Sequence, residues 1–151
     1  MFRGIAAAVV AAFAVTAGAA SAELAKWDQP RVTKYAEELA VATRDLKQAL
    51  EDVGIQNFAQ QNAMYQVKDT VKMLDTAASG LAEALKSGKG LDETMPRYKR
   101  IKTLQRDAQE EGRSADIPES VFERVFAAGS ALIKLAPYYE DLPAEAEKAK
   151  Q

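Results

Sequence analysis

Apolar and polar residues follow one another along the chain after Ala22 with the period of an α-helix. Within each segment the apolar positions recur at steps of three and four residues, and no segment alternates residue by residue as a half-buried strand does. A glycine or proline follows each segment closely and is expected to end it. The pattern therefore predicts four amphipathic helices, at residues 30–53, 58–86, 93–111 and 117–136.

Short polar residues that can accept hydrogen bonds from free N–H groups stand near the predicted helix starts. We expect Asp28 to cap the first helix, and Asp92 or Thr94 to cap the third. Asp116 is expected to cap the fourth helix, and Pro137 to bend or end it.

The second predicted helix has the most regular apolar stripe. Steps of three and four alternate over three heptads, which gives a straight seam for packing against neighbouring helices at a shallow angle. The stripe consists of Met64, Val67, Val71, Leu74, Ala78, Leu81 and Leu85. Four such segments with short connections predict an all-α fold, an antiparallel up-down-up-down four-helix bundle over residues 23–142. A polar C-terminal tail, residues 143–151, is expected to follow it.

The first 22 residues have the features of a secretory signal peptide. Arg3 supplies a positive start, residues 4–19 are almost uniformly apolar, and Ala20-Ser21-Ala22 places small side chains where signal peptidase cleaves. The alternative is an uncleaved membrane anchor, which a short, alanine-rich run favours less. We therefore expect a mature protein without a transmembrane span, located outside the cytoplasm in the periplasm or the thylakoid lumen, or secreted.

The whole chain contains no His and no Cys, and this excludes much chemistry. Ser–His and Cys–His catalysis, ordinary zinc sites, thiolate-held clusters and the Glu-x-x-His di-iron motif all need these residues. With 20 basic and 22 acidic residues the net charge is −2, whereas a general nucleic-acid binder would show a basic excess. We expect a protein that is not an enzyme and uses no metal, cofactor or nucleic acid.

The fourth predicted helix carries a cluster of small residues, 127–131, between large apolar ones. Glycine in mid-helix costs about 1 kcal/mol relative to alanine, so some benefit should offset Gly129. One interpretation is the close approach of a neighbouring helix. The other is the floor of an apolar pocket that would hold a flat ligand or a partner's side chain. The candidate residues for this pocket are Phe122, Phe126, Gly129 and Ile133.

The third predicted helix carries a strip of basic residues opposite its apolar side. The strip consists of Lys99, Lys102 and Arg106, with Arg100 on one flank. It is either a solvated face with ion pairs to other helices or a docking strip for an acidic partner or an anionic membrane surface. Tyr65, on the far side of the second helix from its seam, is a further candidate contact residue, because tyrosine is common at interfaces.

Three aromatic residues stand at helix ends, where they could cover the bundle's open ends. They are Trp27 before the first helix and Tyr138 and Tyr139 after Pro137. We expect them to act as lids rather than to hold a cofactor. The sequence leaves open whether they meet at one end.

Two functions are compatible with these features. The first is an exported, non-enzymatic accessory or extrinsic subunit that binds a protein or membrane complex. The second is a carrier of a small molecule or cofactor, with an apolar site in the bundle core around Gly129. The fold by itself favours neither function.

Overall fold

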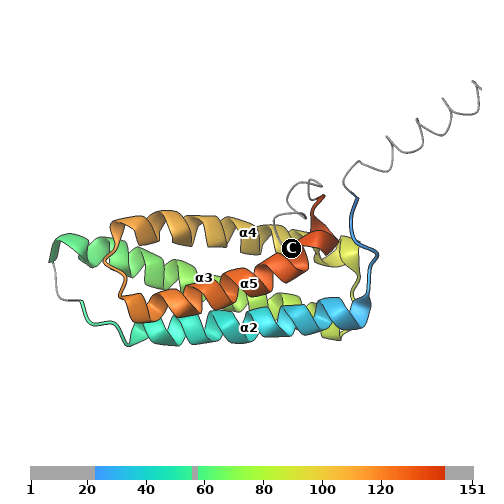
Figure 1. The fold of residues 1–151 in the computed structure, drawn as a ribbon, viewed down its shortest axis with the longest axis horizontal. Coiled ribbons are helices and arrows are strands. Elements are labelled where there is room, and N and C mark those ends of the chain that lie inside the picture. The colour runs from blue at the N-terminus through green and yellow to red at the C-terminus, as the bar shows by residue number, and fades with distance from the viewer. Residues whose placement is uncertain (1–22, 56–57, 142–151) are drawn as a thin grey trace, which may run out of the picture.

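Four α-helices account for most of residues 23–55 and 58–141, the part of the chain that the computed structural model describes (Figure 1). They are α2 (Gln29–Glu51), α3 (Gln61–Lys86), α4 (Leu91–Ser114) and α5 (Glu119–Tyr139), and a short 3-10 turn, η1 (Phe58–Gln60), precedes α3. These residues contain no strand, so the predicted all-α class with four helices is confirmed. The predicted signal peptide, residues 1–22, and the predicted tail, residues 143–151, lie outside the described residues.

The helix starts agree with the predicted caps only in part. Asp28 caps α2 as predicted, and its carboxylate accepts a hydrogen bond from the backbone N–H of Arg31. The prediction for Asp116 is wrong, because the N-cap position of α5 belongs to Pro118. Asp92 and Thr94 are not caps either, because α4 begins earlier, after Gly90.

Of the two outcomes predicted for Pro137, a bend or an end of the helix, the end is wrong, because α5 continues through Pro137 to Tyr139. A proline in the last turn removes one backbone hydrogen bond. Tyr138 and Tyr139, the two residues that follow, are 8% and 4% exposed. Burial of an aromatic side chain contributes about 1.5–3 kcal/mol, which outweighs the loss of one hydrogen bond. Tertiary packing therefore extends the helix beyond the point where the local sequence would stop it.

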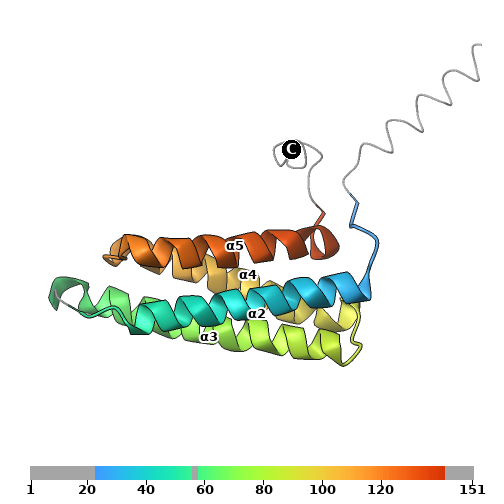
Figure 2. The same ribbon diagram turned by 60° about the horizontal axis from the view of Figure 1, so that its bottom comes forward.

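The helices do not all pack equally against one another. Helix α2 packs against both α3 and α5, and α3 packs against α4, whereas α4 and α5 barely touch (Figures 1 and 2). No helix among the described residues is long and apolar enough to cross a membrane.

The start of α2, the end of α3, the start of α4 and the end of α5 meet at one end of the molecule. The backbone N–H of Ala25 donates to the carbonyl of Pro137 over 2.7 Å. The side-chain amide of Gln29 donates to the carbonyls of Leu85 and Lys89, 2.9 Å from each. The first bond ties the segment before α2 to the end of α5, and the bonds from Gln29 tie the start of α2 to the end of α3 and to the α3–α4 turn.

Aromatic side chains fill this end, which we call the aromatic end and define by Trp27, Tyr98, Tyr138 and Tyr139. The Tyr98 and Tyr139 rings stack with centroids 4.4 Å apart. The Trp27 ring meets Tyr139 and Tyr138 edge-on, at 5.6 and 6.4 Å. Trp27 and the two tyrosines after Pro137 therefore meet at a single end, a point that the sequence left open.

The opposite end, around residues 115–118 between α4 and α5, is packed differently. All four helices contribute buried side chains to the core near the aromatic end. The second core cluster, towards the opposite end, has buried side chains from α2, α3 and α5, but within α4 only the partly buried Ala108 joins it. We call this second half of the bundle the open end.

The sequence of α4 explains the difference between the two ends. Its inward positions recur at steps of four and three, and the first of them, Thr94, Tyr98 and Ile101, are buried. The next ones in the same series are Gln105, Ala108 and Gly112. Side-chain volume on the inner face of α4 thus falls sharply after the first half of the helix, so α4 cannot fill the core at the open end.

Two Tyr→Phe substitutions test the packing of the aromatic end. Within the described structure the buried Tyr98 hydroxyl makes no well-aligned hydrogen bond, although the Glu140 carboxylate lies near it, whereas the Tyr139 hydroxyl is hydrogen-bonded to Thr94 over 2.8 Å. We expect Tyr139→Phe to lower the free energy of unfolding by about 0.5–1.5 kcal/mol, and Tyr98→Phe to leave it unchanged or raise it. Urea unfolding measures both values. A Tyr98→Phe variant less stable than Tyr139→Phe would contradict this assignment.

The same two tyrosines predict a loss of stability at alkaline pH. Burial, reinforced by the nearby Glu140 carboxylate, raises the pKa of the Tyr98 phenol, and burial also raises the pKa of Tyr139. In the unfolded chain a phenol loses its proton near pH 10. Above about pH 10 the unfolded state therefore releases protons that the folded state keeps, so the free energy of unfolding falls as pH rises. Urea unfolding at a series of alkaline pH values should show this fall, with a smaller slope in Tyr98→Phe.

Candidate functional site

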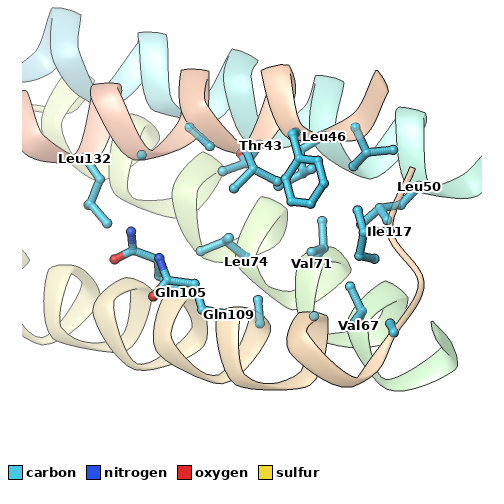
Figure 3. A pocket seen from close by; sticks show the side chains of 18 of the residues that line it. Thr43, Leu46, Leu50, Val67, Val71, Leu74, Gln105, Gln109, Ile117 and Leu132 are labelled. Atoms are coloured by element: carbon cyan, nitrogen blue, oxygen red, sulfur yellow. The ribbon is translucent and has the colours of Figure 1, made fainter. Parts of the chain in front are cut away.

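An apolar cleft of about 730 Å³ lies between α4 and α5 in the open half of the bundle (Figure 3). Binding pockets for small ligands typically measure about 300–1,000 Å³. The floor of the cleft is formed by α2 and α3, through Leu39, Thr43, Leu46, Leu50, Val67, Val71 and Leu74. Thr43 does not make the floor polar, because its hydroxyl donates to the carbonyl of Ala40 within its own helix, over 3.1 Å.

Helix α4 forms the polar side of the cleft. Gln105 and Gln109 extend from α4 towards the space into which Leu74 and Leu132 point from α3 and α5 (Figure 3). Gly112 adds no side chain to this wall. Within the described residues, Arg113 and Asp116 are the only charged residues that line the cleft. The cleft therefore offers apolar surface with a few polar groups along one side, an arrangement suited to binding.

The four residues predicted to form an apolar pocket occupy two different environments. Phe122 and Gly129 line the cleft. Phe126 and Ile133 do not line it, and they point outwards with 73% and 54% of their surfaces exposed. The four residues are spaced at steps of four, three and four on α5, so they form one stripe along the edge of the cleft. We call this stripe the apolar rim.

Gly129 faces open space. A Cβ atom added there would meet no atom within 4 Å, other than those of its own helix turn. A neighbouring helix therefore does not approach closely at Gly129 itself, whereas Ala128 and Ala131 of the same cluster are buried in the core. By contrast, a Cβ added at Gly80 of α3 would lie 3.1 Å from Nη1 of Arg97 on α4.

The structure divides the predicted basic strip between two flanks of α4. Arg100 lies in a shallow groove of about 420 Å³ between α3 and α4, together with Arg97 and Lys72. Lys102 instead reaches towards α5, where its Nζ lies 3.7 Å from the Glu140 carboxylate. Among the described residues Arg106 pairs only with its neighbour Asp107, at 3.4 Å, and Lys99 is exposed.

The part of the strip on the α5 side continues along the cleft. Lys102, Arg106, Gln109 and Arg113 follow one another at steps of four, three and four, so they share one face of α4. Gln109 and Arg113 of this set line the cleft directly. We call these four residues the basic rim.

Tyr65 lies apart from the cleft. Its side chain is half exposed on α3, and its hydroxyl accepts a hydrogen bond from the Gln61 amide over 3.4 Å. The structure does not bring it together with either the basic rim or the apolar rim.

Several residues of α4 that border the cleft were not predicted from the sequence, namely Gln105, Gln109, Gly112 and Arg113. The spacing of the core positions along the third predicted helix could have indicated them. After Leu104 its core positions are occupied by polar or small residues, and such residues cannot fill the interior of a bundle. The described residues contain no group of three or more Asp or Glu side chains that could hold a metal ion.

Comparisons with known proteins return no match to this chain, whether with protein-family models, with curated proteins or with solved structures. The cleft and its two rims are therefore the basis of the function proposed below.

Substitution of Gly129 by alanine tests whether the space beside this residue is open. Alanine is more favourable than glycine within a helix, so we expect Gly129→Ala to raise the free energy of unfolding by about 0.5–1 kcal/mol. Gly80→Ala is the matched control, and it should gain less because the Arg97 side chain must move. Thermal or urea unfolding of both variants gives the comparison. Destabilisation by Gly129→Ala would show that the position is closely packed.

Proposed function

We propose that this chain is an exported, non-enzymatic accessory subunit, built as an up-down-up-down four-helix bundle, that binds an amphipathic helix of a partner protein. The partner helix would lie in the cleft between α4 and α5 and complete the packing of the open end. The export signal predicted for residues 1–22 supports a location outside the cytoplasm, in the periplasm or the thylakoid lumen, or secretion. The lack of His and Cys in the chain supports a binding role rather than catalysis.

The apolar rim is the observation that carries this proposal. Phe126 is 73% exposed and Ile133 54% exposed, and both continue the apolar surface of the cleft beyond its edge. A small molecule enclosed in the cleft would leave these two side chains in water. A helix laid along the cleft would cover the cleft and the rim together, which is how amphipathic helices bind in hydrophobic grooves.

Docking of a partner helix would bury enough apolar surface to stabilise the complex. Burial of one large apolar side chain contributes about 1.5–3 kcal/mol, and the partner would bury Phe126, Ile133 and part of Phe122. Exposed apolar residues scattered singly are normal on a protein surface. Here three large ones stand in line on α5 beside the cleft, whose floor side chains are themselves no more than 5% exposed, so the rim supplies the large exposed apolar side chains of the site. Exposed apolar residues gathered in this way are typical of interaction sites.

A small-molecule carrier is the second candidate, and the volume of the cleft favours it. About 730 Å³ is enough space for a compact apolar ligand. Native mass spectrometry of the protein purified from its own host separates the two candidates. A stoichiometric small-molecule adduct would support the carrier, whereas a protein adduct would support the accessory subunit.

Two Phe→Ser substitutions test the proposed role of the apolar rim. Phe126→Ser should weaken association with the partner at least tenfold, because about 1.4 kcal/mol of lost burial corresponds to that factor. Phe58→Ser is the matched control, since Phe58 is 91% exposed in the α2–α3 connection, away from the cleft. Cross-linking and co-purification from native membranes measure association for both variants, with thermal unfolding as a check of the fold. Equal binding by the two variants would exclude the apolar rim as the contact surface.

A further inference from the structure

We propose that the partner helix carries acidic residues along the edge that faces α4, at spacings of three and four residues. This inference rests on the proposed function and specifies the partner's chemistry. We infer the acidic edge of the partner from a difference between the two rims, one of which is apolar and the other basic. The rim on α5 is apolar, whereas the rim on α4 presents Lys102, Arg106 and Arg113 together with the amide of Gln109.

Lys102 and Arg106 each face one carboxylate, and the two arginines are the cations of the basic rim most open to a partner. No carboxylate among the described residues lies within 4 Å of the Arg113 guanidinium. Arg106 pairs only with the adjacent Asp107, and both side chains are substantially exposed, at 67% and 41%. Exposed pairs of this kind are worth little, so a better-placed carboxylate would replace Asp107 at small cost.

One end of the basic rim already shows the contact that we propose for the rest. Lys102 lies 3.7 Å from Glu140, the residue that follows α5 at the aromatic end. Glu140 thus brings a carboxylate across the gap between the two rims. Towards the open end α5 carries two carboxylates, Glu119 and Glu123, in its first turns, and among the described residues neither pairs with the basic rim. Between these residues and Glu140, α5 has no carboxylate, and a partner helix with an acidic edge would supply one there.

The spacing of the charges favours a helix over an amphiphile with a single head group. From Lys102 to Arg113 the basic rim covers eleven residues, which corresponds to about 16 Å along the helix axis. A fatty acid carries one anionic group at one end and would meet one of these cations. The apolar rim, from Phe122 to Ile133, has the same length. Two rims of equal length, one apolar and one basic, match about three turns of an amphipathic helix.

Three synthetic peptides test the charge preference directly. They share one apolar face of leucines and differ only along one edge, which carries glutamate, glutamine or lysine at steps of three and four. The glutamate peptide should bind residues 23–151 about tenfold more tightly than the lysine peptide at low salt, and the difference should shrink at high salt. Fluorescence anisotropy of labelled peptides gives the dissociation constants.

Variants on the two flanks of α4 provide the control. Arg106→Glu with Arg113→Glu should reverse the order of the glutamate and lysine peptides, and Arg106→Gln with Arg113→Gln should abolish the preference. Arg97→Glu with Arg100→Glu makes the same change of net charge in the groove between α3 and α4. This control should leave the order of the peptides unchanged. An equal effect of both pairs would show a response to net charge, and it would overturn the inference.

The remaining outcomes separate this inference from the proposed function. If the glutamine peptide binds and the three affinities are equal, or the lysine peptide binds best, the acidic edge is wrong and docking of a helix stands. If no peptide binds, the proposed function fails as well. Sodium oleate below its micellar concentration is the lipid probe, and its binding in place of the peptides would assign the cleft to an amphiphile. A dimer in analytical ultracentrifugation that Phe126→Ser dissociates would assign the cleft to a second copy of this chain.

Discussion

The architecture of this protein depends on how side-chain volume is distributed along the inner face of α4. At the aromatic end this face presents Tyr98 and Ile101, which are buried against residues of the other three helices. After Leu104 the inner positions carry a glutamine, an alanine and a glycine. A protein interior is packed nearly as densely as an organic crystal, so helices separate wherever facing side chains cannot fill the space between them. The separation of α4 from α5 and the apolar cleft both follow from this single gradient.

The two ends of the bundle differ in how completely they are packed. The stacked tyrosines, the Thr94–Tyr139 hydrogen bond and the bonds from Gln29 to the α3–α4 turn gather at the aromatic end. At the open end, buried side chains of α2, α3 and α5 form a smaller core, which is the floor of a cleft where α4 does not cover it. Stability concentrated in one half permits an incompletely packed surface in the other, as is common for sites that bind partners.

The regular helices could be predicted because their patterns are local. All seven residues of the α3 stripe, from Met64 to Leu85, are buried, and Asp28 caps α2 through the expected hydrogen bond. The errors arose where tertiary contacts override local preference. Pro137 does not end α5, because the two tyrosines beyond it gain more from burial than the helix loses. Asp116 does not cap α5, because the helix begins after Pro118.

The candidate site was harder to predict, because a cleft is a property of facing helices rather than of any one of them. The sequence directed attention to Gly129 and its large neighbours, of which Phe122 and Gly129 line the cleft while Phe126 and Ile133 stand outside it. The polar wall from α4 was missed, since Gln105 and Gln109 resemble surface residues when their helix is considered alone. Only the pairing of α4 with α3 rather than with α5 shows which of its faces remains uncovered.

The attachment of α4 at one end has a mechanical consequence. This helix is held to α5 near the aromatic end, through Tyr98, Thr94 and Lys102, and further along it contacts mainly α3. A small rotation of α4 about this attachment would change the width of the cleft most at its far end and least beside the tyrosines. Adjustment of the cleft to partner side chains of different sizes would therefore fall on its far end, while the contacts beside the tyrosines would stay in place.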